Sequence, residues 1–420
     1  MNLKSYKIHI VGSGISGLIA AKTLEAQGFA PKIIEATSRV GGRVKTDLVN
    51  NYQLDHGFQV LLESYPEAKK HLDYEVLSLQ KFKPGAVIFK NGKSQTIGDP
   101  LRDFSLFFPT LKATVGTLND KLKILKLNTS LKRKSIEDIF ESENKSTFQY
   151  LKEKGFSDGI ISDFFKPFFS GIFLEPNLET SSRMFEFVYK MFGEGLAVLP
   201  KEGIGVIAEH LLSQLNQTKI FYNSKVKSVT TNNITLENGE QLDTDYTIIA
   251  TEPNLIVPDL ERNTDSWKSC YNLYFEVKNK VIKGALIGLI SDANAIINNI
   301  CYCNNSGVNN SSDKQLLSVT VVKPIKLSEK ELVKQVESEL QQFCNISTSN
   351  FVKMYHIKKA LPDLEYLRAD IDPKDTKLKS NIFLAGDYLL NGSLNAAMIS
   401  GERAAEGVLE SVKEDRLLKT

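Results

Sequence analysis

Cysteine is scarce in this chain, with four residues among 420. They form no CxxC pair and no histidine cluster accompanies them, so we expect no metal site and no thiol-redox chemistry. We expect the four to be reduced and buried in a cytoplasmic protein; they are Cys270, Cys301, Cys303 and Cys344. An excess of one charge is also absent: the net charge is +2, and nothing favours binding to nucleic acid.

Long apolar runs are missing as well. The most apolar late stretch, residues 281–300, is interrupted by Lys283, Gly284, Asp292 and several asparagines. A spanning helix needs about 20 mostly apolar residues, so this stretch is not one. The N-terminus passes from Lys4 and Lys7 directly into a strand-like run without the pattern of a signal peptide. We expect no segment that crosses a membrane.

The first 36 residues follow a β-α-β pattern. An apolar run at 6–11 predicts a strand, residues 15–28 a helix, and residues 31–36 a second short strand. Between strand and helix stand Gly12, Ser13, Gly14, Ile15, Ser16 and Gly17. In such a turn the first glycine permits the tight bend, the second lets a pyrophosphate approach, and the third lets helix and strand pack closely. The turn therefore predicts a dinucleotide site at the helix N-terminus.

Glu35 ends the second strand, where it can accept hydrogen bonds from ribose hydroxyls. An acid at this place disfavours a 2′-phosphate, which leaves FAD or NAD as the ligand.

Three ordered motifs decide between these two. Residues 35–43 read E-A-T-S-R-V-G-G-R, residues 383–387 read F-L-A-G-D, and residues 401–405 read G-E-R-A-A. The chain resembles the flavin-containing amine oxidase superfamily, which includes monoamine oxidases, protoporphyrinogen oxidases and phytoene desaturases. The resemblance is strong at both ends and loose in the middle, and it implies that the cofactor is FAD.

The resemblance also implies roles for particular residues. Arg39 and Arg43 would neutralise the diphosphate, which Gly41 and Gly42 let approach. The less favoured alternative is that these arginines belong to a solvated turn. Asp387 would hold the ribityl chain, and the helix starting near Leu394 would point its amides at the N1/C2=O edge of the flavin. The other cofactor candidates are Ala36, Gly57, Phe58, Val226 (or a core valine), Ala250, Thr251, Gly386, Ser393, Asn395 and Ala396.

The expected fold class is α/β, with a Rossmann-like FAD-binding domain of the GR2 type and an inserted α+β substrate domain. The FAD-binding domain is predicted to comprise residues 1–80, 200–255 and 373–420, and the substrate domain 81–199 and 256–372. A second glycine motif, residues 203–208, lacks a preceding strand and is interpreted as a helix-start turn. With one nucleotide site, electrons would leave to an acceptor such as oxygen or a quinone.

Three polar residues are candidates for catalysis. His56 and Gln59 lie in the segment that family members place beside the flavin ring, and Tyr388 follows Asp387. His56 can alternatively bond only to backbone. Ser393 stands where amine oxidases carry an aromatic cage residue, so no amine cage is expected. The stretch S-L-N-A-A-M-I-S-G at 393–401 is more similar to the carotenoid desaturase and protoporphyrinogen oxidase branches. The aromatic stretches at 104–111 and 163–176 form either an apolar pocket or the core of the insert.

We therefore expect an FAD-dependent oxidoreductase that takes hydride from a largely apolar small molecule onto non-covalent FAD. The alternatives are amine oxidation, redox-neutral isomerisation, and a non-enzymatic carrier on the same fold. The lysine-rich segment 119–135 either forms a solvated helix face or lies on an anionic membrane surface. The expected location is cytoplasmic, with peripheral membrane contact in the second case.

Overall fold

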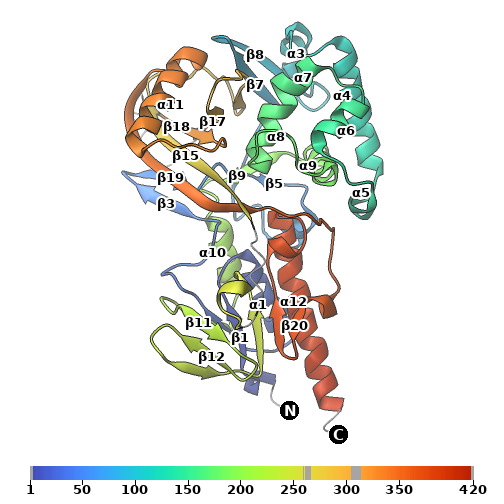
Figure 1. Ribbon diagram of the computed structural model, residues 1–420, viewed down its shortest axis with the longest axis vertical. Helices are drawn as coiled ribbons and strands as arrows, with labels where there is room; N and C mark the ends of the chain where they lie inside the picture. Colours follow the sequence, from blue (N-terminus) through green and yellow to red (C-terminus); the bar gives the residue numbers. More distant parts are fainter. Residues whose placement is uncertain (1–2, 259, 261–265, 304–313, 418–420) are drawn as a thin grey trace.

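The structure, a computed structural model, describes residues 3–258, 260, 266–303 and 314–417. Figure 1 shows a parallel sheet with helices α1 and α12 at one end of the molecule, where both termini also lie. A larger sheet and a group of helices occupy the other end. This mixed α/β arrangement confirms the predicted fold class.

The first sheet draws its strands from three distant parts of the chain. Its order is β10 (Lys219–Phe221), β2 (Lys32–Ile34), β1 (Ile8–Val11), β14 (Tyr246–Ile249), β21 (Ile382–Leu384) and β20 (Lys377–Lys379). All neighbours are parallel except β20 and β21. Every residue of β1 and β14 is buried, as expected for central strands covered on both faces.

Helices α1 (Ile15–Ala26) and α12 (Leu394–Leu417) pack against each other beside this sheet. Their close approach depends on small residues: a Cβ on Gly401 would lie 2.3 Å from the carbonyl oxygen of Ser16. Helix α10 (Val206–Ser213) also packs on α1, and a meander of β11 (Val226–Val229), β12 (Asn233–Leu236) and β13 (Gln241–Asp243) precedes β14. The first and last helices of the chain are therefore neighbours.

The larger sheet has seven strands. Its order is β19 (Thr348–Pro362), β15 (Trp267–Val277), β18 (Gln315–Val321), β17 (Ile297–Cys303), β16 (Ile287–Ile290), β7 (Gly85–Lys90) and β8 (Lys93–Gly98). Helix α11 (Glu329–Cys344) begins with a capping box of Ser328 and Glu331 and packs on this sheet. Two small sheets, β3 (Thr46–Val49) with β4 (Tyr52–Asp55), and β5 (Leu61–Leu62) with β9 (Ala197–Pro200) and β6 (Leu79–Lys81), lie between the ends. Strand β9 precedes the glycine motif at 203–208, so the expectation that no strand stands there is wrong. Because β9 pairs antiparallel with β5 and β6, outside the parallel sheet, the motif still leads only into the start of α10.

A helical layer fills the segment from 104 to 194. It comprises the 3₁₀ turn η2 (Phe104–Leu106), α3 (Phe107–Lys112), α4 (Leu118–Arg133), α5 (Ile136–Glu141), α6 (Thr147–Glu153), α7 (Asp158–Ile160), the π-helical turn η3 (Ile161–Phe165), α8 (Lys166–Phe173) and α9 (Ser182–Glu194). Phe165, Phe169 and Phe173 are fully buried, so this stretch forms core. In contrast, Phe104, Phe107 and Phe108 are exposed and belong to neither a core nor a pocket.

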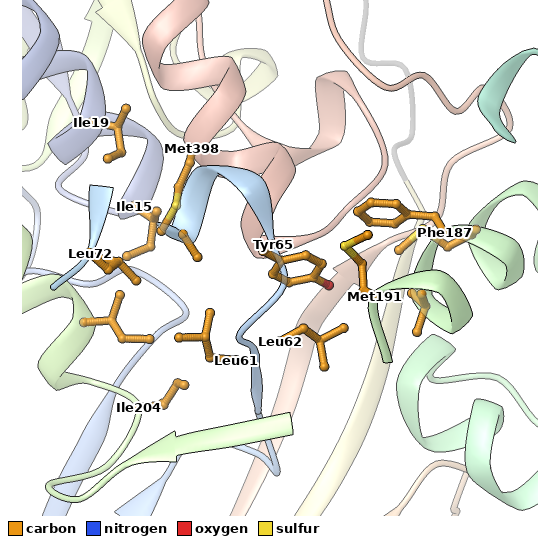
Figure 2. Packing of buried hydrophobic residues seen from close by; sticks show 14 of the residues in the cluster. Ile15, Ile19, Leu61, Leu62, Tyr65, Leu72, Phe187, Met191, Ile204 and Met398 are labelled. Atoms are coloured by element: carbon orange, nitrogen blue, oxygen red, sulfur yellow. The ribbon is translucent and has the colours of Figure 1, made fainter. Parts of the chain in front are cut away.

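One hydrophobic cluster connects the two ends of the molecule. Figure 2 shows Ile15 beside Met398, with Leu61, Leu62 and Tyr65 between these two residues and Phe187 and Met191 of α9. Helix α2 (Pro66–His71) follows Tyr65. Because this cluster crosses the sequence boundaries near residues 80 and 200, the division of the chain into two domains stays a prediction. The four cysteines are free thiols, three of them buried, and among the described residues no helix is long and apolar enough to cross a bilayer.

His9 makes the stability of this sheet depend on pH. Only 3% of its surface is exposed in β1, and Nδ1 lies 3.2 Å from Thr244 Oγ1. Burial, and then the charge of Lys32, lowers the pKa of the imidazole from 6.5 to about 4. Between pH 6.5 and about pH 4, therefore, His9 binds a proton in the unfolded chain but stays neutral in the folded chain. The resulting stability is complete above the unfolded pKa and is lost as the pH falls towards 4.

We expect the wild type to lose about 2 kcal/mol of unfolding free energy from this residue between pH 7 and pH 5. Urea unfolding of the wild type and the His9→Asn variant at both pH values isolates the contribution. The variant should lose about 2 kcal/mol less than the wild type. Equal losses in the two proteins would show that His9 is not the group responsible.

Candidate functional site

A single cavity of about 2040 Å³ extends from the glycine turn after β1 into the helical layer. Pockets for drug-sized ligands measure roughly 300–1,000 Å³, so this cavity has room for a dinucleotide and a second molecule. All residues proposed from the sequence for cofactor binding or catalysis line it, except Gly17, Asn395 and Ala396. The structure thus brings together candidates that lie up to 382 residues apart, from Gly12 to Leu394.

The glycine turn shows three different constraints. Gly12 has φ +100°, and a Cβ there would lie 2.9 Å from the carbonyl oxygen of Ala250. A Cβ on Gly17 would lie 2.1 Å from the carbonyl oxygen of Gly12, so Gly17 serves packing rather than the cavity. A Cβ on Gly14 would meet no atom nearer than 3.9 Å, at Gly42 Cα. Gly14 therefore leaves open space at the N-terminus of α1, where a phosphate group fits.

Glu35 is already bonded by the protein. Its Oε2 accepts hydrogen bonds from the N–H and hydroxyl of Ser13 at 2.9 and 2.6 Å, and Oε1 accepts two from Thr37 at 2.8 and 2.7 Å. Burial raises the pKa of this carboxyl, but these bonds outweigh burial and hold the pKa below its usual range. Four donors match the capacity of a carboxylate. A ribose hydroxyl would thus have to replace the Ser13 or Thr37 hydroxyl.

The two arginines of the second motif differ in their partners. Arg39 donates to Asp47 Oδ1 at 2.5 Å and to the carbonyl oxygen of Thr46 at 2.8 Å, which ties it to β3. Arg43 forms an ion pair with Asp387, whose surface is only 4% exposed. Burial lowers the pKa of Arg43, but the charge of Asp387 and their hydrogen bond outweigh it and raise the pKa. This pair joins the first and last segments of the parallel sheet at the cavity.

Trp267, the single tryptophan of the chain, was not found from the sequence. Its ring lies 5.3 Å from the Arg43 guanidinium carbon and 5.8 Å from Lys359 Nζ, and it lines the cavity. Lys359 in turn pairs with Glu252 at 2.6 Å. No motif marks these residues, because they come from β15, β19 and the turn after β14 and meet only in the fold.

The N-terminus of α12 is the second helix end at the cavity. Ser393 caps it, since its hydroxyl accepts from the N–H of Ala396 at 3.0 Å and donates to Asn391 Oδ1 at 2.7 Å. The side chain of Asn395 points elsewhere and accepts from the N–H of Glu67 at 3.0 Å. The first-turn N–H groups that Ser393 does not satisfy are free to face a ligand.

His56 and Gln59 are held by the protein rather than directed freely at the cavity. His56 Nε2 lies 2.9 Å from Asp47 Oδ2, which also accepts from the Tyr355 hydroxyl at 2.8 Å. Burial raises the pKa of Asp47, but hydrogen bonds from His56, Arg39 and Tyr355 outweigh it and lower the pKa to about 2. Gln59 donates to the carbonyl oxygens of His56 and Arg43 at 2.8 and 3.1 Å.

The far part of the cavity is enclosed by α4, η3, α8 and α9. Its apolar lining includes Ile124, Phe164, Phe168, Ile172, Met184, Val188 and Phe192. Met184, Val188 and Phe192 recur at helical spacing on α9, which is the signal that could have identified this wall in the sequence. The stretch 163–176 was predicted to form either the core of the insert or an apolar pocket, and it forms both. One of its faces is buried in the core and the other lines the cavity.

A parallel sheet with a glycine turn at the carboxyl end of its first strand is typical of a dinucleotide-binding protein. A sequence model of the flavin containing amine oxidoreductase family matches residues 15–409. The chain belongs to this family.

Individual relatives are distant. Protoporphyrinogen oxidase 2 of Arabidopsis thaliana is 26% identical over 165 residues, which is 39% of this chain and 32% of the relative. The corticosteroid-binding protein of Candida albicans is 22% identical over 284 residues, which is 60% of this chain and 53% of the relative. The matches thus span about a third to a half of these relatives. Cyclohexylamine oxidase from Brevibacterium oxydans IH-35A shares the fold, with a TM-score of 0.69 at 16% identity over 97% of this chain and 99% of that one.

Proposed function

We propose that this protein is an FAD-dependent oxidoreductase, which oxidises a largely apolar small molecule by hydride transfer to non-covalently bound FAD. The observation that supports the proposal is the predominantly apolar wall formed by η3, α8 and α9 beyond the glycine turn. A polar molecule would lose its hydration there without matching hydrogen bonds, whereas an apolar one is stabilised by leaving water. We propose oxygen or a quinone as the acceptor of the electrons.

The residues of the cavity fit FAD at both helix ends. The open space at Gly14 and the N–H groups of α1 would bind the pyrophosphate, with Arg43 supplying positive charge. Asp387 would accept from the ribityl chain, and the α12 N-terminus would stabilise negative charge at the pyrimidine edge of the ring. FAD supplies the hydride acceptor when it is bound.

The chain's own part in the reaction is positioning and exclusion of water. Phe164 and Phe168 would hold the substrate against the reacting face and keep the site dry. We assign His56 and Gln59 to orientation, because their hydrogen bonds to Asp47 and to backbone fix them beside the cavity. Tyr388 lines the cavity next to Asp387 and is our candidate for a direct polar contact with the substrate.

The test is anaerobic reduction of the FAD-loaded enzyme by separate panels of carotenoid precursors, porphyrinogens and amines. We expect bleaching of the flavin absorption by at least one apolar compound, followed by reoxidation with oxygen or a quinone. Phe168→Asp should raise KM at least about tenfold for that compound, while Phe168→Leu should change it little. A flavin that stays oxidised with every apolar compound would contradict the proposal.

Amine oxidation is the second candidate, and one observation favours it. The carboxylate of Glu175 lines the cavity, where it accepts hydrogen bonds from the N–H groups of Asn177 and Thr180 at 2.7 and 3.2 Å. A carboxylate at this place can attract a substrate ammonium group. Release of hydrogen peroxide on the amine panel, reduced by Glu175→Gln, would put amine oxidation ahead of the first proposal.

A further inference from the structure

Large apolar side chains gather on the surface of η2, α3 and α4. Among the described residues, sixteen large apolar side chains are exposed, and eight of them come from one stretch of 25 residues. We name these eight the apolar patch; they are Leu101, Phe104, Phe107, Phe108, Leu111, Leu118, Leu122 and Leu125. Leu101, Phe104, Leu118 and Leu122 are each at least 65% exposed. Concentrations of this kind mark interaction surfaces in soluble proteins.

Helix α4 is apolar on two opposite sides. Leu127 and Leu131 are buried against the protein, which is the one apolar face that a surface helix needs. Leu118, Leu122 and Leu125 follow the i, i+4, i+7 spacing on the opposite side and are exposed. This second stripe contributes nothing to the folded core.

Helix α3 repeats the pattern with aromatic residues. None of its residues is fully buried, and the Phe107 ring stacks on Phe104 at 5.7 Å and meets Phe108 at 5.4 Å. Phe107 thus connects the other two rings on the surface. Lys121 of α4 donates to the carbonyl oxygens of Thr110 and Ala113 at 2.8 and 2.9 Å, so the end of α3 adjoins the start of α4. Both helices lie on the outer side of the helical layer (Figure 1).

The charge around the patch is mostly positive. Residues 101–134 contain eight Lys and Arg but two Asp, in a chain whose net charge is only +2. Both acids are already bonded: Asp120 is buried in the capping box of α4, and Asp103 pairs with Lys83 at 3.0 Å. Arg102 pairs with Asp99 at 3.1 Å. The exposed cations for which the described residues give no acidic partner are Lys112, Lys126, Lys132 and Arg133. Apolar side chains flanked by unmatched cations complement a bilayer that carries anionic headgroups.

The patch is also continuous with the cavity. Leu125 belongs to both, and Arg102, Thr110 and Lys121 line the cavity beside it. A molecule dissolved in a bilayer would thus reach the cavity without crossing water. This continuity favours a lipid surface over a protein partner as the occupant. The passage of a substrate from the bilayer into the cavity rests on the proposed function, whereas the binding of the protein to the bilayer does not.

We propose that the apolar patch inserts into the interfacial region of an anionic lipid bilayer, with the surrounding lysines and arginines at the headgroups. The enzyme then lies on the membrane with the α3–α4 end of its cavity turned towards the lipid. Long basic side chains can reach the headgroups while the leucine and phenylalanine side chains enter the acyl boundary.

The test is co-sedimentation of the FAD-loaded full chain with vesicles of phosphatidylcholine alone or mixed with phosphatidylglycerol. We expect binding to the mixed vesicles that weakens in high salt, and at least about tenfold weaker binding of the Phe104→Ser/Phe108→Ser/Leu122→Ser variant. The matched control, Leu48→Ser/Val76→Ser/Leu327→Ser, removes exposed apolar residues elsewhere and should bind like the wild type.

Two outcomes would overturn the proposal: no binding to mixed vesicles, or equal binding by the patch variant and the wild type. Self-association of the wild type through the patch, without vesicle binding, would instead identify a second copy as the occupant. Reduction of the flavin by a water-dispersed substrate should be unchanged in the patch variant. Failure of the proposed function would therefore be seen in the flavin-reduction assay, whereas failure of membrane binding would be seen in the vesicle assay.

Discussion

Replacing Gly14 by alanine is expected to leave the protein folded and to weaken FAD binding by about 100-fold. The backbone of Gly14 has φ −68°, which alanine adopts without strain, and its Cβ would lie 3.9 Å from the nearest heavy atom. The added methyl would occupy the open space at the N-terminus of α1. A phosphate displaced from that space would lose charge-assisted hydrogen bonds, each worth about 1.5–3 kcal/mol.

Titration of apoprotein with FAD, followed by flavin fluorescence, measures this loss, and thermal unfolding of the apoprotein checks the fold. Gly159→Ala is the matched control, because its Cβ would meet only the Ser157 hydroxyl at 3.7 Å, away from the cavity. Gly17→Ala should behave differently from Gly14→Ala. Its Cβ would lie 2.1 Å from the Gly12 carbonyl oxygen, so the turn itself must move and stability falls as well. Unchanged FAD affinity in Gly14→Ala would refute the assignment of this space to the pyrophosphate.

The turn and the two strands beside it could be predicted because each depends on local rules, whereas the helix at 394 was inferred from the family resemblance. A buried strand followed by three glycines at fixed spacing specifies its own geometry within about ten residues. The Ser393 cap of α12 is also local, although only the structure identified it. The capping box that begins α11 is equally local. Sequence reasoning is reliable where the chain interacts with itself at short range.

Pairs distant in sequence could not be predicted in the same way. Arg43 and Asp387 were each proposed for a different part of the cofactor, yet in the structure they pair with each other across 344 residues. Trp267 joins them from a third segment. The side-chain pattern of one segment does not specify which partner from another segment will neutralise it.

The aromatic stretch at 104–111 illustrates a second limit. An apolar run predicts removal from water, and we expected a core or a pocket. Phe104 and Phe108 are instead 76% and 61% exposed. Composition alone does not tell whether an apolar side chain is buried in the core of its own chain or inserts into a lipid bilayer. The hydrophobic effect favours its removal from water equally in both cases.

Replacing Asp387 by asparagine is the second change with a large expected effect. Asp387 is 4% exposed, and its charge is balanced by Arg43. The amide keeps the shape but removes the charge, so Arg43 loses its partner and the ribityl chain loses a charged acceptor. We expect FAD to bind about 30- to 100-fold more weakly, corresponding to about 2–3 kcal/mol. Flavin fluorescence titration of the apoprotein again measures the change.

A double-mutant cycle with Arg43→Met separates the pair from its neighbours. If Arg43 and Asp387 act as one unit, the double variant should lose less FAD-binding free energy than the sum of the losses in the two single variants. The difference, which is the coupling energy, should be about 1–2 kcal/mol. The control is Asp370→Asn, which breaks another Asp–Arg pair, to Arg403 at 2.6 Å, whose residues do not line the cavity. This control should leave FAD binding unchanged. Strict additivity of Asp387→Asn and Arg43→Met would mean that the ion pair has no part in holding the cofactor, and that each residue meets FAD separately.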